Sequence, residues 1–540
     1  MRAGAPRAAA EGFHAVSERK SEGRSPGLAA AMRVLLRVAA AAALAILLGC
    51  GHDEPPRGSI QGWVYVPSAV AQRSALFASR SPVPPQGYRP AAGAAVVVTG
   101  SSASTGTNAQ GYYRIDHLKA GQHTVGVSLS GYYAVSFAVQ VAGGRLVTAG
   151  RDDGSTLLQP AQRKWTVMVF LNADNDLETF GIQDVNEMEM VGSSGAVDIV
   201  VQMDRIPGYD ASNGNWTDCR RFRVVKDPAE TDPAAREPLS NTIVSPVLED
   251  LGEVDMGQPQ TLHDFIAWAQ AAFPAEHYLL VLWDHGSGWL VRERRRQFQR
   301  PPLRAVSYDY TSDTFISTTA LPQGLTTWPQ PDVIAFDASL MQMVEVAYEI
   351  RGQGRLMVGS EDSPPGPGYA YQTFLRQLVA NPAMTPAELT GHIVNDTIAF
   401  YGSASGVTQS SADLGQIGAV RLALQNFAVA LEMATPAHGA QIASARAAAQ
   451  AFAYPENKDL YDFARLCGER VDDQRVKDTA AAMLSAIQSA VIAEAHGSAR
   501  PGSHGLAIYL PTPANYSSTY GLLALSRDTV WDDWLPLGPK

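Results

Sequence analysis

The stretch AFDASLMQMVEVAYEI, residues 335–350, decides how the second half of this 540-residue chain is interpreted. Apolar residues of a strand lead into Asp337-Ala338-Ser339, and an amphipathic helix is predicted to begin immediately afterwards. Open α/β sheets form their sites beyond the carboxyl ends of their strands. Ser339 is therefore either a hydroxyl placed for chemistry or an N-cap whose oxygen accepts a backbone N–H of the helix.

Similar apolar runs occur on both sides of this stretch. They are WTVMVFL (165–171), VDIVVQM (197–203), HYLLVLW (277–283) and RLMVGS (355–360). Helical patterns such as LHDFIAWAQAAF (262–273) lie between them. Strands without polar alternation, separated by helices, predict a mostly parallel sheet that is buried on both faces. A long helical stretch at 415–495 and a late strand at 504–511 extend this α/β domain over about 160–540.

The preceding segment has a different texture. Short β-type runs such as GSIQGWVYV, AAVVVTG and GYYRIDHL are separated by glycines, which predicts a small all-β sandwich over 58–150. Gly111 and Gly121 are expected at turns, and Tyr113, Ile115 and Leu118 are expected to alternate toward its core. The Pro-, Ala- and Ser-rich insertion at 68–92 is predicted to be a loop.

The N-terminus is typical of an export signal. Residues 1–31 are rich in Arg, Ala and Ser and are interpreted as a non-native or disordered leader. MRVLLRVAAAAALAILLGC, residues 32–50, combines a basic start with an apolar run too short to span about 30 Å of hydrocarbon. LLGC resembles a bacterial lipobox, which implies lipidation of Cys50. Residues 51–57 would then tether a lipoprotein to the cell envelope, at the outer membrane or cell surface. An uncleaved anchor or an ordinary secretory signal is the alternative.

Composition narrows the class of partner. The formal net charge is −11, which argues against nucleic acid because phosphate binding needs a basic surface. The three cysteines, Cys50, Cys219 and Cys467, form neither a disulfide framework nor a metal-finger spacing. The arginine-rich run at 291–304 is predicted to be an exposed loop, either solvated or cut by an arginine-preferring protease.

Two predicted strands end in residues that can do chemistry. HYLLVLW is followed by Asp284-His285-Gly286, and the other strand by Ser339. The interval from 285 to 339 leaves room for one crossover connection, so the two strands are expected to be neighbours. His285 could then face Ser339, while Gly286 lets the backbone turn and present an N–H to an oxyanion. Asp284 is a poor candidate for orienting His285, because successive residues at a strand end point in different directions.

Longer motifs carry a family resemblance. WTVMVFLNADNDLE, LVLWDHGSGW, AFDASLMQMVEVAYEI, GSEDSPPGPGYAY and DLYDFARL occur in this order and resemble the clostripain family of cysteine endopeptidases, which has a caspase-like α/β fold. TNAQGYYRIDHLKAGQHTVGVSLSGYY resembles the carboxypeptidase regulatory-like domain. The first resemblance implies that His285 is the catalytic histidine, that Gly286 and the N–H of residue 339 form the oxyanion hole, and that Asp337 recognises a basic P1 side chain.

The chain departs from the family at its centre. The family pattern is Asp-Ala-Cys-Leu-Met, whereas Ser339 stands here at the nucleophile position. A thiol has a pKa of about 8.5 and ionises readily beside an imidazole, but a serine hydroxyl needs a well-oriented base to remove its proton. Pro364 and Pro367 also stand near positions where the family often has acidic residues. Cys219 and Cys467 are not expected to replace the missing thiol.

Three functions follow from this pattern. The first is a peptidase homologue, impaired or inactive, that retains a peptide-binding cleft. The second is an active endopeptidase that uses Ser339 as nucleophile and His285 as base and cleaves after basic residues. The third is a structural or adhesion lipoprotein of the cell surface.

Calcium is the one metal that the sequence suggests. Asp174, Asp176 and Glu178 in NADNDLE could bind Ca²⁺ through carboxylate oxygens. Their spacing is not that of an EF-hand, and capping of the following helix is the alternative.

Overall fold

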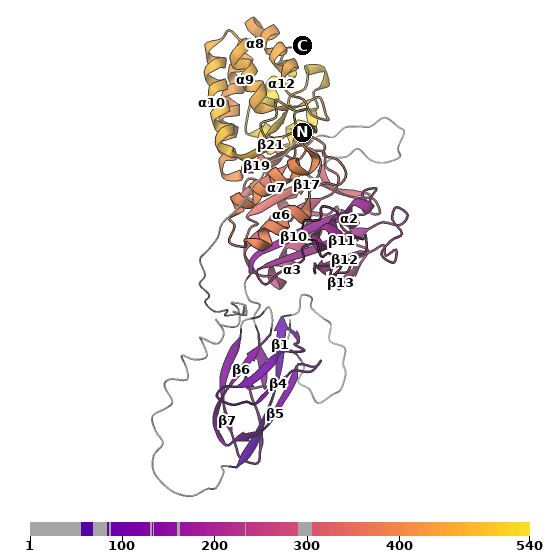
Figure 1. The fold of residues 1–540 in the computed structure, drawn as a ribbon. Coiled ribbons are helices and arrows are strands. Elements are labelled where there is room, and N and C mark those ends of the chain that lie inside the picture. The colour runs from indigo at the N-terminus through magenta and orange to yellow at the C-terminus, as the bar shows by residue number, and fades with distance from the viewer. Residues whose placement is uncertain are drawn as a thin grey trace, which may run out of the picture. The chain divides into compact units, whose positions relative to one another are not determined.

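The computed structural model describes residues 56–67, 84–85, 88–129, 132, 134–158, 163–232, 234–289 and 305–539. The predicted leader, signal peptide, Cys50 and arginine-rich loop lie outside the described residues. The described residues form two compact units, one drawn mainly from residues up to Thr156 and the other mainly from Leu157 onward (Figure 1).

The first unit is all-β and contains two sheets. One sheet has the order β2-β1-β5, with β8 and β9 also pairing with β1, and the other has the order β4-β3-β6-β7. The bounds are β1 Arg57–Pro67, β2 Tyr88–Pro90, β3 Ala95–Val98, β4 Ser104–Gly106, β5 Tyr112–Lys119, β6 Gly121–Ser128, β7 Val135–Val141, β8 Leu146–Thr148 and β9 Ser155–Leu157.

The core of this unit contains the predicted residues, with one irregularity. Tyr113, Ile115 and Leu118 are all buried, although strict alternation would place residue 117 inward. His117 has a φ of 62°, and the register of β5 against β1 shifts at this point, so Leu118 turns inward instead. Gly111 and Gly121 have the positive φ values expected at turns.

The second unit is built on a nine-stranded sheet with the order β13-β12-β11-β10-β14-β17-β18-β19-β21. The five central strands from β11 to β18 are mutually parallel, as predicted, and the antiparallel strands β12, β13, β19 and β21 extend both edges. The bounds are β10 Arg163–Ala173, β11 Val197–Arg205, β12 Cys219–Arg223, β13 Val247–Gly252, β14 Ala275–Trp283, β17 Val333–Asp337, β18 Leu356–Gly359, β19 Thr408–Asp413 and β21 Val491–His496.

Helices cover both faces of this sheet. Alternate residues of β10 point to opposite sides: Val167 and Val169 pack with α2, α6 and α7, and Met168 and Phe170 pack with α3, α4 and α5. The bounds are α2 Glu178–Glu189, α3 Pro259–Ala272, α4 Leu321–Leu325, α5 Val344–Ile350, α6 Tyr371–Ala380 and α7 Pro386–Tyr401.

The C-terminal part adds a helical layer. Helices α8 (Ile417–Ala448), α9 (Leu460–Arg470), α10 (Gln474–Ala490) and α12 (Trp531–Leu537) group together at one end of this unit (Figure 1). The segment Leu414–Ala448 is long and apolar enough to cross a membrane, but half of its apolar stretch is buried inside the protein. Because α8 packs against α9, α10 and α12, its buried apolar side chains, such as Leu424, Phe427 and Leu431, serve as core.

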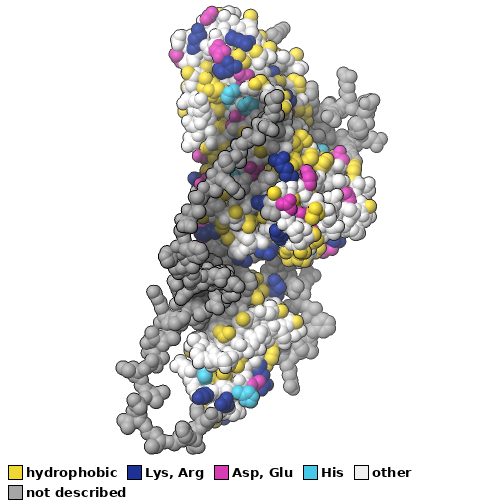
Figure 2. Space-filling view, viewed as in Figure 1, with side chains coloured by type: hydrophobic (Ala, Val, Ile, Leu, Met, Phe, Trp, Pro, Cys, Tyr) yellow, Lys and Arg dark blue, Asp and Glu magenta, His cyan; other side chains and the backbone are white. Residues whose placement is uncertain are grey.

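The predicted late strand forms outside the main sheet. It is β22 (Ala507–Tyr509), which pairs with β20 (Asn457–Asp459) in a separate two-stranded sheet. Another small sheet joins β15 (Ala305–Asp309) to β16 (Thr314–Ser317). On the face drawn in Figure 2, the described Lys and Arg side chains are interspersed with Asp and Glu.

Candidate functional site

The site begins where β14 and β17 end. These strands are parallel neighbours, and Trp283 of β14 lies opposite Asp337 of β17. His285 and Ser339 therefore each follow the paired positions by two residues, at the same edge of the sheet. Both residues are partly exposed. The expectation that they follow neighbouring strands is confirmed by this register.

Gly286 brings the two strand ends into close contact. A Cβ atom at position 286 would lie 2.4 Å from the carbonyl oxygen of Ser339 and 3.0 Å from its nitrogen. A side chain is excluded at that separation, so glycine is required for the backbones to approach. The contact places residue 286 against the backbone of residue 339, as an oxyanion site shared by the two would need.

Ser339 does not cap a helix, so the capping interpretation is wrong. Helix α5 begins at Val344, four residues later than the sequence predicts, and Met343 is its N-cap residue. Leu340 has a φ of 62°, and its N–H donates to the carbonyl of Asp362 across the site. That bond and the left-handed backbone prevent an early helix start. The Ser339 hydroxyl instead hydrogen-bonds to the Ser363 hydroxyl at 3.0 Å.

A carboxylate orients His285, and it is Asp176. The Nε2 atom of His285 lies 2.7 Å from Oδ1 of Asp176, which also accepts a hydrogen bond from the Tyr310 hydroxyl at 2.9 Å. The hydrogen bond from His285 is the main reason that the pKa of Asp176 falls to about 2. Neither role considered for Asp176 from the sequence includes this contact.

Asp284 has a different role, in line with the sequence argument. Its buried carboxylate accepts hydrogen bonds from the Asn175 side chain at 2.8 Å and from the backbone N–H groups of His285 and Tyr308. Burial raises its pKa to about 8. Asp284 thus fixes the backbone that carries His285, while Asp176 holds the imidazole.

The contact between His285 and Asp176 limits which imidazole nitrogen can take a proton from Ser339. Because Nε2 of His285 is bonded to a carboxylate, a base acting on Ser339 would have to use Nδ1. An imidazole oriented by a carboxylate is the arrangement that serine hydrolases use to activate a hydroxyl.

Asp337 lies in a buried group of acids that we call the acidic pocket, defined by Asp184, Glu187 and Asp337. The Asp337 carboxylate accepts hydrogen bonds from the Tyr371 hydroxyl at 2.9 Å and from the Tyr369 N–H at 3.1 Å. Trp283 donates to Asp184 at 2.5 Å. One oxygen of Asp184 and one of Glu187 are buried without a hydrogen-bond partner.

The electrostatics of the acidic pocket favour a positive charge. Burial is the main cause that raises the pKa of Glu187 to about 8 and that of Asp184 well above its usual value, and repulsion from neighbouring acids, including Asp337, adds to both shifts. Burial raises the pKa of Asp337 to about 7. Carboxyl groups with raised pKa values regain their charge when a cation enters beside them. Such a pocket can therefore bind a basic side chain.

The sequence reasoning missed Asp184 and Glu187. Both lie on α2 among the buried residues Ile182, Val185 and Met188, so acids on the apolar side of an amphipathic helix were the available signal. Asp184 and Glu187 precede Asp337 in the sequence, whereas Pro364 and Pro367 follow it. The acids that accompany Asp337 therefore come from α2 and not from the segment that contains the two prolines.

Cys219 and Cys467 do not supply a thiolate. Both are buried, and burial raises the pKa of each thiol far above its usual range. Cys219 begins strand β12, which lies between β11 and β13, and Cys467 lies in α9.

A second group of acids, the four-carboxylate cluster, consists of Asp174, Asp204, Glu253 and Asp309. One ligand oxygen from each lies within 4.8 Å of those from the others. Of the residues suggested for calcium, Asp174 alone belongs to this cluster. Glu178 instead forms a buried ion pair with Arg205 at 2.7 Å.

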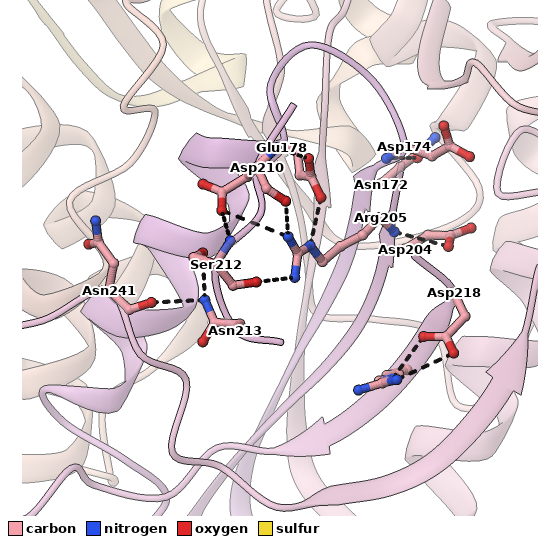
Figure 3. Close-up of polar contacts among 11 residues, drawn as sticks. Asn172, Asp174, Glu178, Asp204, Arg205, Asp210, Ser212, Asn213, Asp218 and Asn241 are labelled. Atoms are coloured by element: carbon pink, nitrogen blue, oxygen red, sulfur yellow. Dashed lines mark hydrogen bonds and ion pairs between the residues drawn. The ribbon is translucent and has the colours of Figure 1, made fainter. Parts of the chain in front are cut away.

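Figure 3 shows how neighbouring residues of β11 separate these two environments. Arg205 extends toward Glu178, Asp210 and Ser212, and it donates to the backbone carbonyls of the last two. Asp204 and Asp174 lie on the other side of it. The positive charge of Arg205 therefore compensates Glu178 and not Asp204 or Asp174.

Profiles of two known families match the two parts of this chain. The sequence profile of the Clostripain family matches residues 169–536, and that of the CarboxypepD_reg-like domain matches residues 85–151. Clostripain from Hathewaya histolytica is 28% identical over 235 residues, which cover 40% of this chain and 43% of that protein. The chain thus aligns with less than half the length of this relative.

Solved structures were also compared. An inactive zymogen C11 protease from Parabacteroides distasonis has a TM-score of 0.50 at 20% identity, covering 68% of this chain and 99% of that one. This likeness shows a common fold. A secreted C11 cysteine protease from Bacteroides thetaiotaomicron, in complex with an irreversible peptide inhibitor, has a TM-score of 0.49 at 18% identity, with 68% and 99% coverage.

Proposed function

The chain belongs to the clostripain family, and we propose that it is a peptidase homologue whose cleft binds peptides through a basic side chain while Ser339 leaves it with little or no hydrolytic activity. The proposal includes a caspase-like topology for the α/β domain. It also includes anchoring at the cell envelope through lipidated Cys50, beyond the inner membrane. A relative described as secreted supports that compartment.

The acidic pocket is the observation that carries the binding part of the proposal. Asp337 is two residues from Ser339, and the pocket holds two buried carboxylate oxygens without partners. A lysine or arginine side chain would offer these oxygens donors and an opposite charge. A relative solved with a peptide inhibitor supports a peptide as the ligand.

The chemistry at position 339 supports the loss of activity. A serine hydroxyl is a poor nucleophile unless a base takes its proton during the attack. The Ser339 hydroxyl is hydrogen-bonded to the Ser363 hydroxyl, and the imidazole of His285 is held by Asp176. Replacement of a catalytic thiol by a hydroxyl in such a site is expected to cost several orders of magnitude in rate.

An active serine endopeptidase is the second candidate. The pair formed by Asp176 and His285 favours it, because a carboxylate behind the histidine is what a serine nucleophile needs. Gly286, in contact with the backbone of residue 339, would contribute to the oxyanion site in both cases.

One set of variants distinguishes these functions. Purified wild type, Ser339→Ala and Ser339→Cys would be incubated with fluorogenic peptides ending in Arg, Lys or norleucine, and binding of the uncleaved peptides would be measured by fluorescence anisotropy. We expect binding without turnover in wild type and turnover after Arg or Lys in Ser339→Cys, at least about 100-fold above wild type.

The other outcomes have clear meanings. Turnover in wild type that disappears in Ser339→Ala would establish the serine endopeptidase instead. Absence of both binding and turnover in all three proteins would favour a structural or adhesion role. For the anchor, labelling by a palmitate analogue should disappear in Cys50→Ala.

A further inference from the structure

The all-β unit is basic in a chain that is acidic as a whole. Residues 57–156 contain eight Lys and Arg and three Asp and Glu, whereas the formal net charge of the chain is −11. Asp116 is the only acid between residues 57 and 150. A surface with an excess of cations attracts anions such as phosphate groups. The function proposed for the α/β domain leaves this charge without a role.

The strand pairing gathers basic side chains at one end of this unit. Arg57 begins β1 and is paired with Lys119 at the end of β5. Arg145 precedes β8, and its carbonyl accepts a backbone N–H of β1 at 2.9 Å. At the start of β6, Nε2 of His123 lies 2.7 Å from the carbonyl oxygen of Lys119. Figure 2 shows Lys, Arg and His side chains together at one end of this unit. We define the basic end as Arg57, His117, Lys119, His123 and Arg145.

The cations of the basic end are accessible to a ligand. Arg57, Lys119 and Arg145 are all exposed. Asp116 is the nearest acid in sequence, but its carboxylate pairs with Arg114 at 2.9 Å. Within the described part of the chain, Lys119 and Arg145 form no ion pair with a carboxylate. Their charges are therefore open to an external anion.

The chain enters the basic end directly from the predicted lipidation site. Cys50 precedes Arg57 by seven residues. An extended chain spans at most about 3.3–3.6 Å per residue, so the two residues lie within about 25 Å of each other. A lipid on Cys50 would hold that residue at a bilayer surface. The end of the sandwich that follows the anchor in the chain is therefore the basic one, although Asp53 and Glu54 in the tether offset part of its charge.

Anionic phospholipid headgroups fit this surface. Arg and Lys form charge-assisted hydrogen bonds with phosphate oxygens. Leu146, next to Arg145, is 43% exposed, and an apolar side chain at this position can enter the boundary between headgroups and acyl chains. Because a short tether keeps the surface at a high effective concentration beside the bilayer, a modest attraction is enough to hold it there.

We propose that the basic end of the all-β unit binds the anionic phosphate headgroups of the membrane that holds the lipid on Cys50. The proposal rests on the lipidation of Cys50 proposed above. A lipid combined with a basic surface gives two attachment signals, and two signals hold a protein to a bilayer more stably than one. The all-β unit thus serves as the membrane-contacting part of the protein.

Vesicles test the surface without the lipid anchor. The chain from residue 51 onward, which contains every described residue, would be sedimented in about 50 mM NaCl with two kinds of vesicle: phosphatidylcholine alone, or phosphatidylcholine and phosphatidylglycerol in equal parts. Wild type should bind the anionic vesicles at least about tenfold more tightly than the neutral ones. Each cation near an anionic surface strengthens binding about fivefold, so Lys119→Gln combined with Arg145→Gln should weaken it about 25-fold.

A matched control removes the same charge elsewhere in the unit. Arg89 and Arg151 are exposed, and their neighbours Ala91 and Gly154 bond to the later half of β1, away from Arg57. Arg89→Gln combined with Arg151→Gln should therefore weaken binding by at most about threefold. Asp53→Asn combined with Glu54→Gln should strengthen it, because the tether acids no longer offset the basic end.

Several results would overturn the proposal. These are equal binding of wild type to neutral and anionic vesicles, equal losses in the two arginine- and lysine-depleted double variants, or binding that is unchanged at about 0.5 M NaCl. Equal affinity for a DNA duplex at the same phosphate concentration would also overturn it, because the surface would then take any polyanion. Since Lys119 and Arg145 are exposed, their double variant is expected to fold, and circular dichroism checks this.

The surface and the anchor fail separately. The chain from residue 51 lacks Cys50, so its binding to vesicles does not depend on lipidation. Palmitate labelling that persists in Cys50→Ala would show that the anchor is wrong, whatever the vesicles show. Labelling that depends on Cys50, together with no preference for anionic vesicles, would keep the anchor and refute the role of the basic end.

Discussion

The acidic pocket and the four-carboxylate cluster are two answers to the same physical problem. Each buries several carboxylates in the α/β domain, and each leaves two oxygens without hydrogen-bond partners. In the acidic pocket, Tyr371 and Trp283 provide side-chain donors to Asp337 and Asp184. In the cluster, backbone N–H groups of the loops and strand ends donate to Asp174, Asp204 and Asp309.

The two groups differ in position as well as in their donors. The acidic pocket lies two residues from Ser339, so a positive charge can come and go there with a peptide. The four-carboxylate cluster joins the ends of four segments, so repulsion among its acids is a cost to the fold itself. Repulsion in the acidic pocket is acceptable because the positive charge of a ligand is expected to neutralise it.

The largest effect should follow from removing charge in the acidic pocket. Asp337→Asn is expected to weaken binding of an arginine peptide about 100-fold, or about 2.7 kcal/mol, because a buried charge pair loses one partner. Fluorescence anisotropy would measure it, with a norleucine peptide as reference. Glu276→Gln, which changes an exposed acid paired with Lys164, should leave the binding of both peptides unchanged. Equal loss for both peptides would contradict charge recognition.

The next effect separates the two groups in the absence of metal. In EGTA at pH 8, Asp204→Asn should stabilise the protein by about 1–2 kcal/mol, because one member of a repelling buried group is removed. Urea unfolding would measure the change, and Asp250→Asn is the control. Destabilisation by the variant in EGTA would mean that Asp204 makes a favourable interaction without calcium.

The acidic pocket should also respond to pH. Since the pKa of Asp337 is about 7, this carboxyl is protonated in the free protein below pH 7 and charged above it. Affinity for the arginine peptide should therefore rise about tenfold from pH 6 to pH 8. The norleucine peptide should show little change. A flat profile for arginine would indicate that Asp337 does not meet the basic side chain.

The same raised pKa has the opposite sign for stability. A carboxyl that binds its proton more tightly when folded contributes stability below its unfolded pKa of about 4, and that contribution disappears as the pH rises through 7. The free protein should thus lose stability over the range in which peptide affinity increases.

Glu345, a buried acid that belongs to neither group, provides the smallest test. Glu345 accepts hydrogen bonds from the Tyr509 N–H at 2.8 Å and the Tyr520 hydroxyl at 2.9 Å, and burial raises its pKa to about 7. Glu345→Gln should flatten the loss of stability between pH 4.5 and pH 7 by an amount on the order of 1 kcal/mol. Urea unfolding at several pH values would measure this. An unaltered slope would show that Glu345 contributes nothing to the pH dependence.

Local patterns predicted the scaffold well because burial leaves a direct mark on sequence. Apolar runs such as Val167–Leu171 indicated strands covered on both faces, and the parallel centre of the sheet followed from the helices between them. The antiparallel edge strands were missed. β13, for example, is half polar and half exposed, so its pairing is not written in its own residues.

The amino-acid sequence by itself determined the order of the central strands and the helices between them, the placement of His285 and Ser339 after two strands, and the oxygen at the nucleophile position. These depend on periodicity and on residue identity, which are local properties. Tertiary structure alone decided that α5 starts late, that Asp176 holds His285, and that Asp184 joins Asp337. Such choices depend on hydrogen bonds and charges between separate segments of the chain, and the partners become neighbours only when the sheet has formed.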